Sequence, residues 1–461
     1  MASLNFTRLT RAVEIGSNAY AIDLAGKRVV LDCGLHPQLS GTLGLPQFEL
    51  FPDGTVDAIV ITHAHQDHIG SLPVFQRRHP QAKVFLTEAT RQLGDIMLHN
   101  SVNVMYREKE QGAVDPVLFG HREVDHGMKQ WIAAPLETRF DLTGERLGQD
   151  EPADVSLELF DAGHILGSVG VRIRADGRTI FYTGDVQFND QTLSRAAVFP
   201  DEPVDVLIME CTRGDHAIDP RQTRETEEAR FIKCLHEVFD GGGGVLVPTF
   251  ALGKTQELLA MCYEFRRKGV LRADCPIYIG GLGAKLTEVH DRLSGHTRRQ
   301  HPNLRLADEV APFVIAGQSA AETPMKGRRI YGLSSGMMSE HTVSNVFARK
   351  VLASREHAIF FIGYCDPETP GGFIQHARPG DLIELSPDTE PVALNCRVEK
   401  FDFSGHATRE SLRAYVNRVR PTKVLLVHGS PEAANWFRET ISADLPGCQV
   451  LIPEPGVTLE I

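Results

Sequence analysis

The chain of 461 residues contains no run of about 18 consecutive apolar residues, which is the length that a membrane-spanning helix requires. The opening segment, MASLNFTRLTRAVEIGSNAY, has no apolar core of the length found in secretion signals. No repeat of solenoid length is present, so a repeat protein is excluded. These absences predict a cytoplasmic protein that does not enter a membrane.

Cysteine is scattered, with eight residues and no pair in the CxxC spacing of zinc knuckles and redox motifs. A disulfide framework and a cysteine-based zinc site are therefore disfavoured. We expect reduced thiols, most of them buried. The eight residues are Cys33, Cys211, Cys234, Cys262, Cys275, Cys365, Cys396 and Cys448.

Basic residues are in deficit: 48 lysines and arginines stand against 60 aspartates and glutamates, giving a formal net charge of −12. Taken alone, this balance argues against a nucleic-acid partner, because proteins that bind polyanions usually present a basic face. The argument is partial, since carboxylates can sit on metal ions whose charge then dominates the site. The remaining proportions, 42% hydrophobic and 23% charged residues, are those of a globular protein, and the length predicts two or three domains.

Six short apolar runs each lead into a histidine or a carboxylate, and this is the main pattern in the sequence. Each run has about four residues, many of them β-branched, and is closed by a glycine or a polar residue, which indicates a β-strand. Ligands at strand ends converge on a rigid scaffold. The residues that follow or end these runs are Asp32, His63, His164, Asp185, Glu210 and His428.

The strongest local motif is HAHQDH at 63–68, with three imidazoles and one carboxylate in six residues. Neutral imidazole and carboxylate are ligands that suit zinc. A strand end places His63 and His65 on the same side of the chain, whereas Asp67 and His68 lie on the turn into a helix and can face a second ion. The residues that follow have the apolar spacing of that helix, at positions 69, 72 and 75.

Eight motifs, taken in order, resemble those of the β-CASP group of metallo-β-lactamase-fold nucleases, which includes the mRNA 3′-end processing endonuclease and RNase J-type enzymes. Each motif is short, and the specificity lies in the set and its order, which runs nearly end to end. The motifs are LDCG at 31–34, THAHQDHIGSLP at 62–73, DAGHILGS at 161–168, TGD at 183–185, PTFALGKTQELL at 248–259, SSGMM at 334–338, FSGH at 403–406 and LVHG at 426–429.

The resemblance implies an α/β fold, a metallo-β-lactamase αββα sandwich with an inserted β-CASP α/β domain. It implies that residues 1–210 and 398–461 form the N-terminal and C-terminal parts of the metallo-β-lactamase domain and that residues 211–397 form the β-CASP domain. The inserted domain would close over the metals. A narrow cleft admits an unstacked single strand more readily than a duplex.

The same resemblance implies two zinc ions, with manganese as the alternative metal. One ion would be held by His63, His65 and His164, the other by Asp67, His68 and His428, with Asp185 bridging the two. Asp32 would orient the histidine loop from behind these ligands.

Catalysis would rest on a second set of residues that overlaps the ligands. By resemblance the set comprises Asp67, Asp185, Glu210 and His406. His406 would contact the scissile phosphate and protonate the leaving oxygen. A histidine polarised by a nearby carboxylate is a suitable acid near neutral pH.

The last histidine bears on the substrate. In this group the RNA enzymes have a histidine at the end of the final strand, and His428 stands at that position, so the resemblance favours RNA over DNA. We predict a zinc-dependent ribonuclease that hydrolyses phosphodiester bonds of single-stranded RNA, as an endonuclease, a 5′-to-3′ exonuclease or both, by a two-metal mechanism. A DNA nuclease of the same family and a small-molecule metallo-hydrolase are the alternatives. We expect no membrane partner, and self-association into a homo-oligomer stays open.

Two segments depart from the family pattern, and two motifs mislead. Cys211 and Arg213 stand where the family usually has Ser and Tyr, and the loop at 363–370 is unusual after its Gly-Tyr start.

The tripeptide GKT at 253–255 ends like a phosphate-binding P-loop but lacks the glycine five residues earlier. The GxSxG match at 332–336 is typical of serine hydrolases, but it explains none of the metal ligands.

Two helices complete the predictions. The segment after His406 predicts a helix over Arg409–Val419, followed by Pro421 and a strand. A second helix is expected to begin near Met337, where Ser334 or Ser335 would cap it or donate a hydrogen bond to RNA phosphate.

Overall fold

The computed structural model describes residues 4–112 and 116–461. The chain forms two compact units: unit 1 contains the residues up to Asn189, Ala196–Ala217 and His406–Ile461, and unit 2 contains Asp190–Arg195 and Ile218–Gly405. The units change over at 217/218 and at 405/406, near the predicted domain boundaries at 210/211 and 397/398, which remain a prediction.

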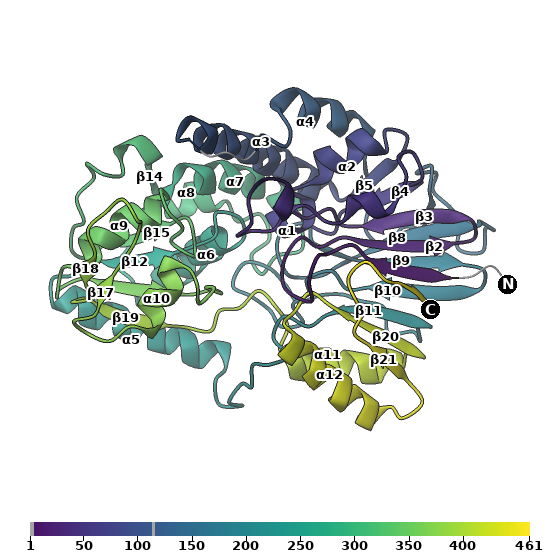
Figure 1. Cartoon of the computed structure of the whole chain (residues 1–461). Helices are drawn as coiled ribbons and strands as arrows, with labels where there is room; N and C mark the ends of the chain where they lie inside the picture. The colour runs from purple at the N-terminus through teal and green to yellow at the C-terminus, as the bar shows by residue number, and fades with distance from the viewer. Residues whose placement is uncertain (1–3, 113–115) are drawn as a thin grey trace. The chain divides into compact units, whose positions relative to one another are not determined.

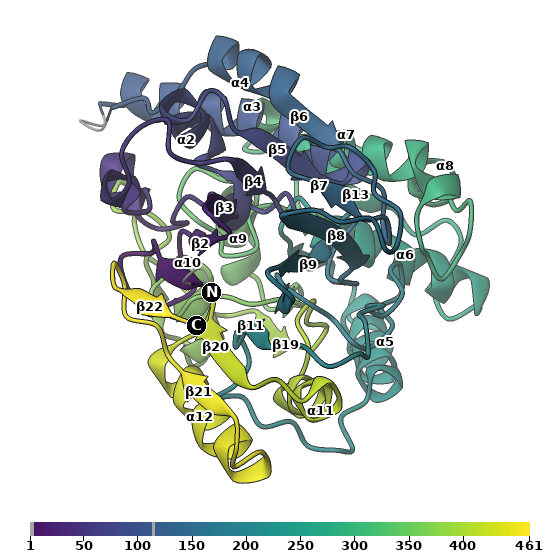
Figure 2. The same cartoon turned by 90° about the vertical axis from the view of Figure 1, so that its right-hand side faces the viewer.

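Unit 1 contains two seven-stranded sheets. The strands of the first sheet, in spatial order, are β22 (Thr458–Glu460), β1 (Asn5–Arg8), β2 (Tyr20–Leu24), β3 (Lys27–Leu31), β4 (Ala58–Val60), β5 (Lys83–Leu86) and β6 (Trp131–Ala133). Those of the second are β21 (Gln449–Leu451), β20 (Lys423–Val427), β11 (Val206–Glu210), β10 (Arg178–Tyr182), β9 (Val169–Ala175), β8 (Val155–Asp161) and β7 (Phe140–Asp141). The first sheet is completed by the pairing of β1 with β22, in which Asn5 lies opposite Glu460 (Figure 2).

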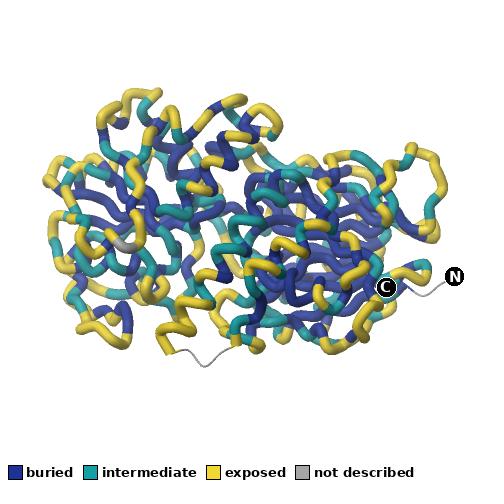
Figure 3. The backbone as a smooth tube through the Cα atoms, turned by 90° about the horizontal axis from the view of Figure 1, so that it is seen from above, coloured by how far each residue is buried: buried dark blue, intermediate teal, exposed yellow. Residues whose placement is uncertain are grey.

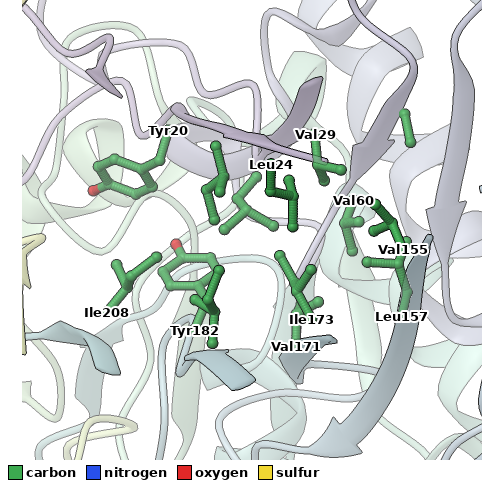
Figure 4. Packing of buried hydrophobic residues seen from close by; sticks show 14 of the residues in the cluster. Tyr20, Leu24, Val29, Val60, Val155, Leu157, Val171, Ile173, Tyr182 and Ile208 are labelled. Atoms are coloured by element: carbon green, nitrogen blue, oxygen red, sulfur yellow. The ribbon is translucent and has the colours of Figure 1, made fainter. Parts of the chain in front are cut away.

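Alternation along the strands of unit 1 creates its layers. Val29 and Leu31 of β3 belong to the apolar cluster between the two sheets, whereas Val30 between them belongs to a cluster on the outer face of the first sheet. Figure 4 shows the inter-sheet cluster, in which the rings of Tyr20 and Tyr182 meet edge to face with centroids 5.7 Å apart. Each such side chain contributes roughly 1.5–3 kcal/mol when fully buried, so this layer is a main source of stability in unit 1.

Helices cover both outer faces of the paired sheets. On the first sheet these are α1 (Gln66–Ile69), α2 (Leu72–Arg78), α3 (Glu88–Glu110) and α4 (His121–Gly127), and on the second α11 (Arg409–Val419) and α12 (Pro431–Asp444). Figure 1 shows α2, α3 and α4 on one side of the strands and α11 and α12 on the other. Apolar clusters beneath each set of helices join helix to sheet. This is the four-layer αββα arrangement predicted from the sequence.

Unit 2 contains one six-stranded sheet in which every pairing is parallel. Its strands, in spatial order, are β14 (Phe313–Ile315), β13 (Ile277–Gly280), β15 (Ile330–Leu333), β12 (Val245–Pro248), β16 (Ala358–Phe361) and β19 (Arg397–Lys400). Its helices are α5 (Arg224–Asp240), α6 (Lys254–Arg267), α7 (Gly281–Arg292), α8 (Leu306–Val310), α9 (Val343–Leu352) and α10 (Pro370–His376). A parallel sheet needs a crossover between strands and is covered on both faces, which is why helices separate most of the strands here.

Short elements complete the two units. A two-stranded ladder in unit 2 joins β17 (Leu382–Ile383) to β18 (Val392–Ala393). The 3₁₀ turns are η1 (Gly41–Gly44), η2 (Phe48–Leu50), η3 (Met128–Gln130), η4 (Ser294–His296) and η5 (Gly317–Ser319). Figure 3 shows that in each unit the central strands are buried and many connecting loops are exposed.

Three helix predictions can be compared with the structure. The helix predicted over Arg409–Val419 is confirmed as α11. The helix expected after HAHQDH is two short helices, α1 and α2, because Pro73 in the first turn of α2 has no N–H to continue the hydrogen-bond ladder. The helix expected near Met337 is wrong: α9 begins at Val343, since Met338 and His341 have positive φ angles of 53° and 59° that no right-handed helix contains.

The cysteine prediction is confirmed: all eight residues are free thiols, and every one except Cys448 is buried. Among the described residues, no helix combines the length and the apolar character needed to cross a membrane.

Candidate metal centre

The six residues predicted at strand ends all belong to unit 1. Asp32 and His428 directly follow β3 and β20, Glu210 is the last residue of β11, and His63, His164 and Asp185 lie in the loops that leave β4, β8 and β10. Because β3 runs parallel to β4, and β11 runs parallel to both β10 and β20, their carboxyl ends gather at one edge of each sheet. The fold therefore collects these side chains without help from the long loops.

The first candidate group contains His63, His65, His164 and Asp185, whose ligand atoms lie within 4.8 Å of one another. His65 Nδ1 is 3.1 Å from His63 Nε2 and 3.2 Å from His164 Nε2. Asp185 Oδ2 is 3.5 Å from His63 Nε2 and 3.7 Å from His164 Nε2. Four ligand atoms around one point, three of them imidazole nitrogens, form a donor set suited to zinc.

The second candidate group contains Asp67, His68 and His428. Asp67 Oδ2 lies 3.2 Å from His428 Nε2 and 3.6 Å from His68 Nε2. The other oxygen of Asp185, Oδ1, lies 3.4 Å from His68 Nε2 and 3.4 Å from His428 Nδ1. Asp185 thus offers one carboxylate oxygen to each group.

The chemistry of this donor set fits bound cations. Asp185 is buried, and its Oδ1 has no hydrogen-bond partner within the described residues. A buried carboxylate oxygen without a donor is costly, and a cation between the two groups would compensate it. Burial lowers the pKa of His63 well below its usual value, as does the charge of His68, which favours the neutral form that binds a metal. Burial would lower the pKa of His68, but the carboxylates around it outweigh burial and raise that pKa, so a cation bound by His68 would take the place of its proton.

The carboxylates are held ionised. Burial would raise the pKa of Asp67, but the His68 charge and a hydrogen bond from His428 outweigh it and lower that pKa to about 2. The pKa of Asp185 is likewise held well below its usual value, because His428 and His68 outweigh burial. At neutral pH both side chains therefore carry the charge that a metal ligand needs.

A third candidate group joins Asp185 to Glu210 and His406. His406 Nδ1 lies 3.2 Å and 3.1 Å from the two carboxylate oxygens of Glu210. Glu210 is fully buried, and its Oε1 also accepts the Val186 N–H at 2.8 Å. Burial would lower the pKa of His406, but the Glu210 and Asp185 charges outweigh it and raise that pKa. The contact with Glu210 therefore favours the protonated form of His406.

Asp32 supports the histidine loop from behind, although it offers no atom to the candidate groups. Its carboxylate accepts hydrogen bonds from the Thr62 N–H at 2.7 Å, from the Tyr182 hydroxyl at 2.9 Å and from His68 Nδ1 at 2.8 Å. Asp32 and His428 both have left-handed backbones, with φ of 61° and 49°. For residues other than glycine this conformation costs roughly 1–2 kcal/mol and recurs at functional sites.

Sequence reasoning missed several residues that hold the ligands. Tyr182 and Thr62 donate to Asp32, and Thr212 Oγ1 lies 2.8 Å from His428 Nδ1. Asn18, in the loop between β1 and β2, contacts Asp67. None belongs to a His or carboxylate motif, so their roles depend on contacts between segments far apart in the sequence. Gly34 did lie in a quoted motif: a Cβ there would meet Asp67 O at 1.8 Å, so only glycine fits.

The misleading motifs have structural explanations inside unit 2. Lys254 is the first residue of α6, and its Nζ donates to the Phe403 carbonyl. The Thr255 hydroxyl is buried against Thr249 Oγ1 at 3.0 Å, which leaves it inside the protein and not on a nucleotide. Ser335 Oγ accepts the Ser339 N–H at 3.0 Å in the turn before α9.

Fold and site together define a class. An αββα sandwich that gathers histidines and carboxylates into adjoining groups at its strand ends is a metal-binding protein of the metallo-β-lactamase fold. Family models agree: the metallo-beta-lactamase superfamily matches residues 13–232, the Beta-Casp domain residues 255–374, and the Zn-dependent metallo-hydrolase RNA specificity domain residues 391–453. The chain belongs to the metallo-β-lactamase superfamily, in the branch that carries a β-CASP domain. The predicted family and fold class are thus confirmed.

Individual relatives cover most of this chain. It is 28% identical over 451 residues to an RNase J-like protein of Methanocaldococcus jannaschii, with 97% of both chains covered. It is 28% identical over 451 residues to RNase aCSPSF2 of Saccharolobus solfataricus, covering 97% of this chain and 83% of the relative. It is 26% identical over 464 residues to cleavage and polyadenylation specificity factor subunit 3-I of Arabidopsis thaliana, covering 97% of this chain and 62% of the relative.

The chain spans 57–62% of the length of three eukaryotic relatives of the cleavage-factor type. Among solved structures, a protein of unknown function from Enterococcus faecalis matches with a TM-score of 0.55 at 13% identity, with 100% of both chains covered. This likeness concerns the fold alone.

Proposed function

We propose that this chain hydrolyses phosphodiester bonds of single-stranded RNA with two bound zinc ions. The observation that carries the proposal is a set of three adjoining groups. Asp185 belongs to the first and the third, and its Oδ1 lies 3.4 Å from His68 Nε2 and from His428 Nδ1 of the second. A site for a small-molecule hydrolase would need the first two groups only. The Glu210–His406 pair adds the acid that a phosphodiester leaving group needs.

The proposed ligands follow the geometry. His63, His65 and His164 would hold one ion and Asp67, His68 and His428 the other, with Asp185 facing both. Imidazole and carboxylate donors favour zinc, and manganese is the alternative. When bound, two such cations lower the pKa of a water molecule to about 7 and neutralise the charge on phosphate oxygens.

The chain's own residues supply the proton and its control. The pKa of His406 is raised, because Glu210 stabilises the imidazolium. We assign this proton to the oxygen that leaves when the phosphodiester bond breaks. Glu210 also accepts the Val186 N–H, which fixes the carboxylate that orients His406.

RNA is favoured as the substrate by the relatives. They include proteins named RNase J-like protein, RNase aCSPSF2 and Endoribonuclease YSH1. The match to the RNA specificity domain, residues 391–453, includes both His406 and His428. A DNA nuclease of the same family is the second candidate, while cytoplasmic location and self-association remain predictions from the sequence.

Cleavage of labelled strands tests the proposal. The 5′-labelled single-stranded RNA and a DNA of matched sequence are incubated with the protein, with a chelator, and with the chelator followed by excess zinc. We expect cutting of RNA alone, its loss with the chelator and its return with zinc, and the product ladder separates endonuclease from exonuclease action. Cleavage of DNA in preference to RNA would favour the second candidate. A zinc-loaded protein that cuts neither strand would point to the small-molecule hydrolase.

A further inference from the structure

Asn18 is a fully buried amide beside the second candidate group. Its Nδ2 lies 3.1 Å from Asp67 O, 3.4 Å from Asp67 Oδ2 and 3.3 Å from His68 Nε2. The fourth acceptor within reach is Gly16 O, at 3.2 Å. Two of these four atoms, Asp67 Oδ2 and His68 Nε2, are the atoms that would hold the second ion. An amide nitrogen, which can only donate, therefore stands against both of them.

The orientation of this amide is fixed by a neighbour in the core. The Tyr20 hydroxyl donates to Asn18 Oδ1 at 2.8 Å, so the carbonyl side of the amide faces Tyr20 and the NH₂ side faces Asp67 and His68. Tyr20 is itself fully buried in the inter-sheet layer (Figure 4). The packed ring of Tyr20 fixes the position of its hydroxyl oxygen, although the hydrogen on that oxygen can rotate. The amide of Asn18 therefore has a hydrogen-bond donor at a fixed position.

The main chain of Asn18 also makes hydrogen bonds, to Asp67 and to Gly34. Its N–H donates to Asp67 O at 2.9 Å, and its carbonyl accepts the Gly34 N–H at 2.8 Å. The loop between β1 and β2 is thereby bound to the start of α1, which carries Asp67 and His68. These backbone contacts hold the loop in place, and the side-chain amide adds its contacts to Asp67 Oδ2 and His68 Nε2.

We propose that Asn18, held by Tyr20, is a positioning residue that prepares Asp67 and His68 for the second cation. By donating to one lone pair of Asp67 Oδ2, the amide fixes the rotamer of the carboxylate, so less side-chain freedom is lost when an ion binds. The contact is specific to one position, because the side-chain acceptors of this amide belong to the second group. The inference rests on the proposed two-metal site and adds that the two positions are prepared by different parts of the chain.

Titration with cobalt tests this assignment, because Co²⁺ takes zinc ligands and absorbs visible light whereas Zn²⁺ does not. Chelator-treated protein is titrated with Co²⁺ while the absorbance and the bound equivalents are followed. We expect two equivalents in the unaltered protein. In Asn18→Ala the first equivalent should bind unchanged, and the second should bind about 10- to 100-fold more weakly with an altered spectrum, as is typical when a group behind a metal ligand is removed.

Two tyrosine variants make the test independent of the folding of Asn18→Ala. Tyr20→Phe keeps the ring and removes only the hydroxyl that orients the amide, and we expect the second equivalent to bind about fivefold more weakly. Tyr415→Phe is the matched control, since its buried hydroxyl makes one hydrogen bond, to Pro200 O at 3.2 Å, away from the centre. It should bind both equivalents as the unaltered protein does. Thermal unfolding of each variant separates lost stability from lost cobalt.

The outcomes are distinct. If the unaltered protein binds two equivalents and both Asn18→Ala and Tyr20→Phe retain them with the same affinity and spectrum, the inference is overturned and the proposed function stands. If Asn18→Ala does not fold, an unchanged second equivalent in Tyr20→Phe overturns the inference in its place. If the unaltered protein binds fewer than two equivalents, the two-metal proposal fails and this inference fails with it.

Discussion

Buried charge is handled differently in the two units. In unit 2, Glu257 accepts the Thr192 and Leu193 N–H groups at 2.7 Å and 2.9 Å and pairs with Arg224. Asp291 accepts two further N–H groups, from Leu306 at 2.7 Å and Ala307 at 2.8 Å. These buried carboxylates of unit 2 have donors from the chain itself.

Unit 1 contains the opposite arrangement. Its buried histidines and carboxylates face one another at the strand ends. Asp185 Oδ1 makes no hydrogen bond to a described residue, and its nearest partners, His68 Nε2 and His428 Nδ1, are each 3.4 Å away. Imidazoles that bind a metal are neutral, and they then leave such a carboxylate without a counter-charge from the chain, which a bound cation would supply. The contrast teaches that the candidate site is recognised by incomplete pairing, and that the number of buried charges alone does not reveal it.

The largest expected effect comes from removing a ligand in unit 1. Asp67→Ala deletes the carboxylate that lies 3.2 Å from His428 Nε2, and we expect RNA cleavage to fall by about 10³-fold or more while the circular dichroism spectrum stays unchanged. Asp219→Ala is the matched control, since its exposed carboxylate pairs with Arg221. Retained cleavage with full metal content in Asp67→Ala would contradict the two-metal assignment.

The next effect concerns the proton on His406. Glu210→Gln removes the charge that opposes burial, so the pKa of His406 should fall. With a lower pKa, His406 gives up its proton at lower pH, so the alkaline limb of the rate profile should move to lower pH. We also expect kcat to drop about 10²-fold. Glu202→Gln, at an exposed carboxylate of unit 1, should leave the profile in place. A fall in kcat without movement of the limb would show that Glu210 acts in another way.

In unit 2 the expected effect is on stability. Glu257→Gln removes the buried charge that pairs with Arg224, leaving that arginine with Glu228 as its counter-ion, and weakens two backbone hydrogen bonds. We expect unfolding in urea to become about 3 kcal/mol easier. Metal content should not change, because the candidate ligands all lie in unit 1. Glu225→Gln is the control, since Glu225 is exposed and lies next to Arg224 in helix α5. It should change stability by less than about 0.5 kcal/mol. Loss of metal in Glu257→Gln would contradict the expectation that this carboxylate of unit 2 affects stability and not metal binding.

The smallest effect depends on pH. Burial lowers the pKa of His290 in unit 2 to about 3, from an ordinary value of 6.5. Because the folded-state pKa is depressed, the unfolded chain binds the proton first, and stability present above pH 6.5 is lost as the pH falls toward 3. His290→Leu should therefore lose about 2 kcal/mol less stability than the unaltered protein between pH 7 and 5, as measured by urea unfolding at both values. Parallel losses in both proteins would show that His290 is protonated when folded.

Many of the strands and of the candidate ligands could be predicted from the sequence, because the ligands follow short apolar runs. Asp32, Glu210 and His428 stand where a short apolar run stops, and the run, its length and the residue after it are all local features of the sequence. The helix α11 was equally local, since its bounds follow from an apolar spacing closed before Pro421. The αββα layers came from the family resemblance, because which face of a strand meets a helix is not a local feature.

Contacts between distant segments could not be predicted. Asn18 reaches Asp67 across 49 residues, and Tyr182 reaches Asp32 across 150. Neither residue type is a common zinc ligand, so no zinc-binding pattern in the sequence includes it. The split into α1 and α2 could have been found, since Pro73 was visible, whereas the positive φ angles before α9 depend on packing in unit 2.

The pairing of β1 with β22 has a consequence for folding during synthesis. A ribosome that has just released β1 must add more than four hundred residues before β22 exists, and His428 emerges almost as late. At common rates of synthesis this delay is on the order of tens of seconds. The edge of the first sheet stays unpaired until β22 is made, and the proposed metal centre cannot be complete before His428 has been added.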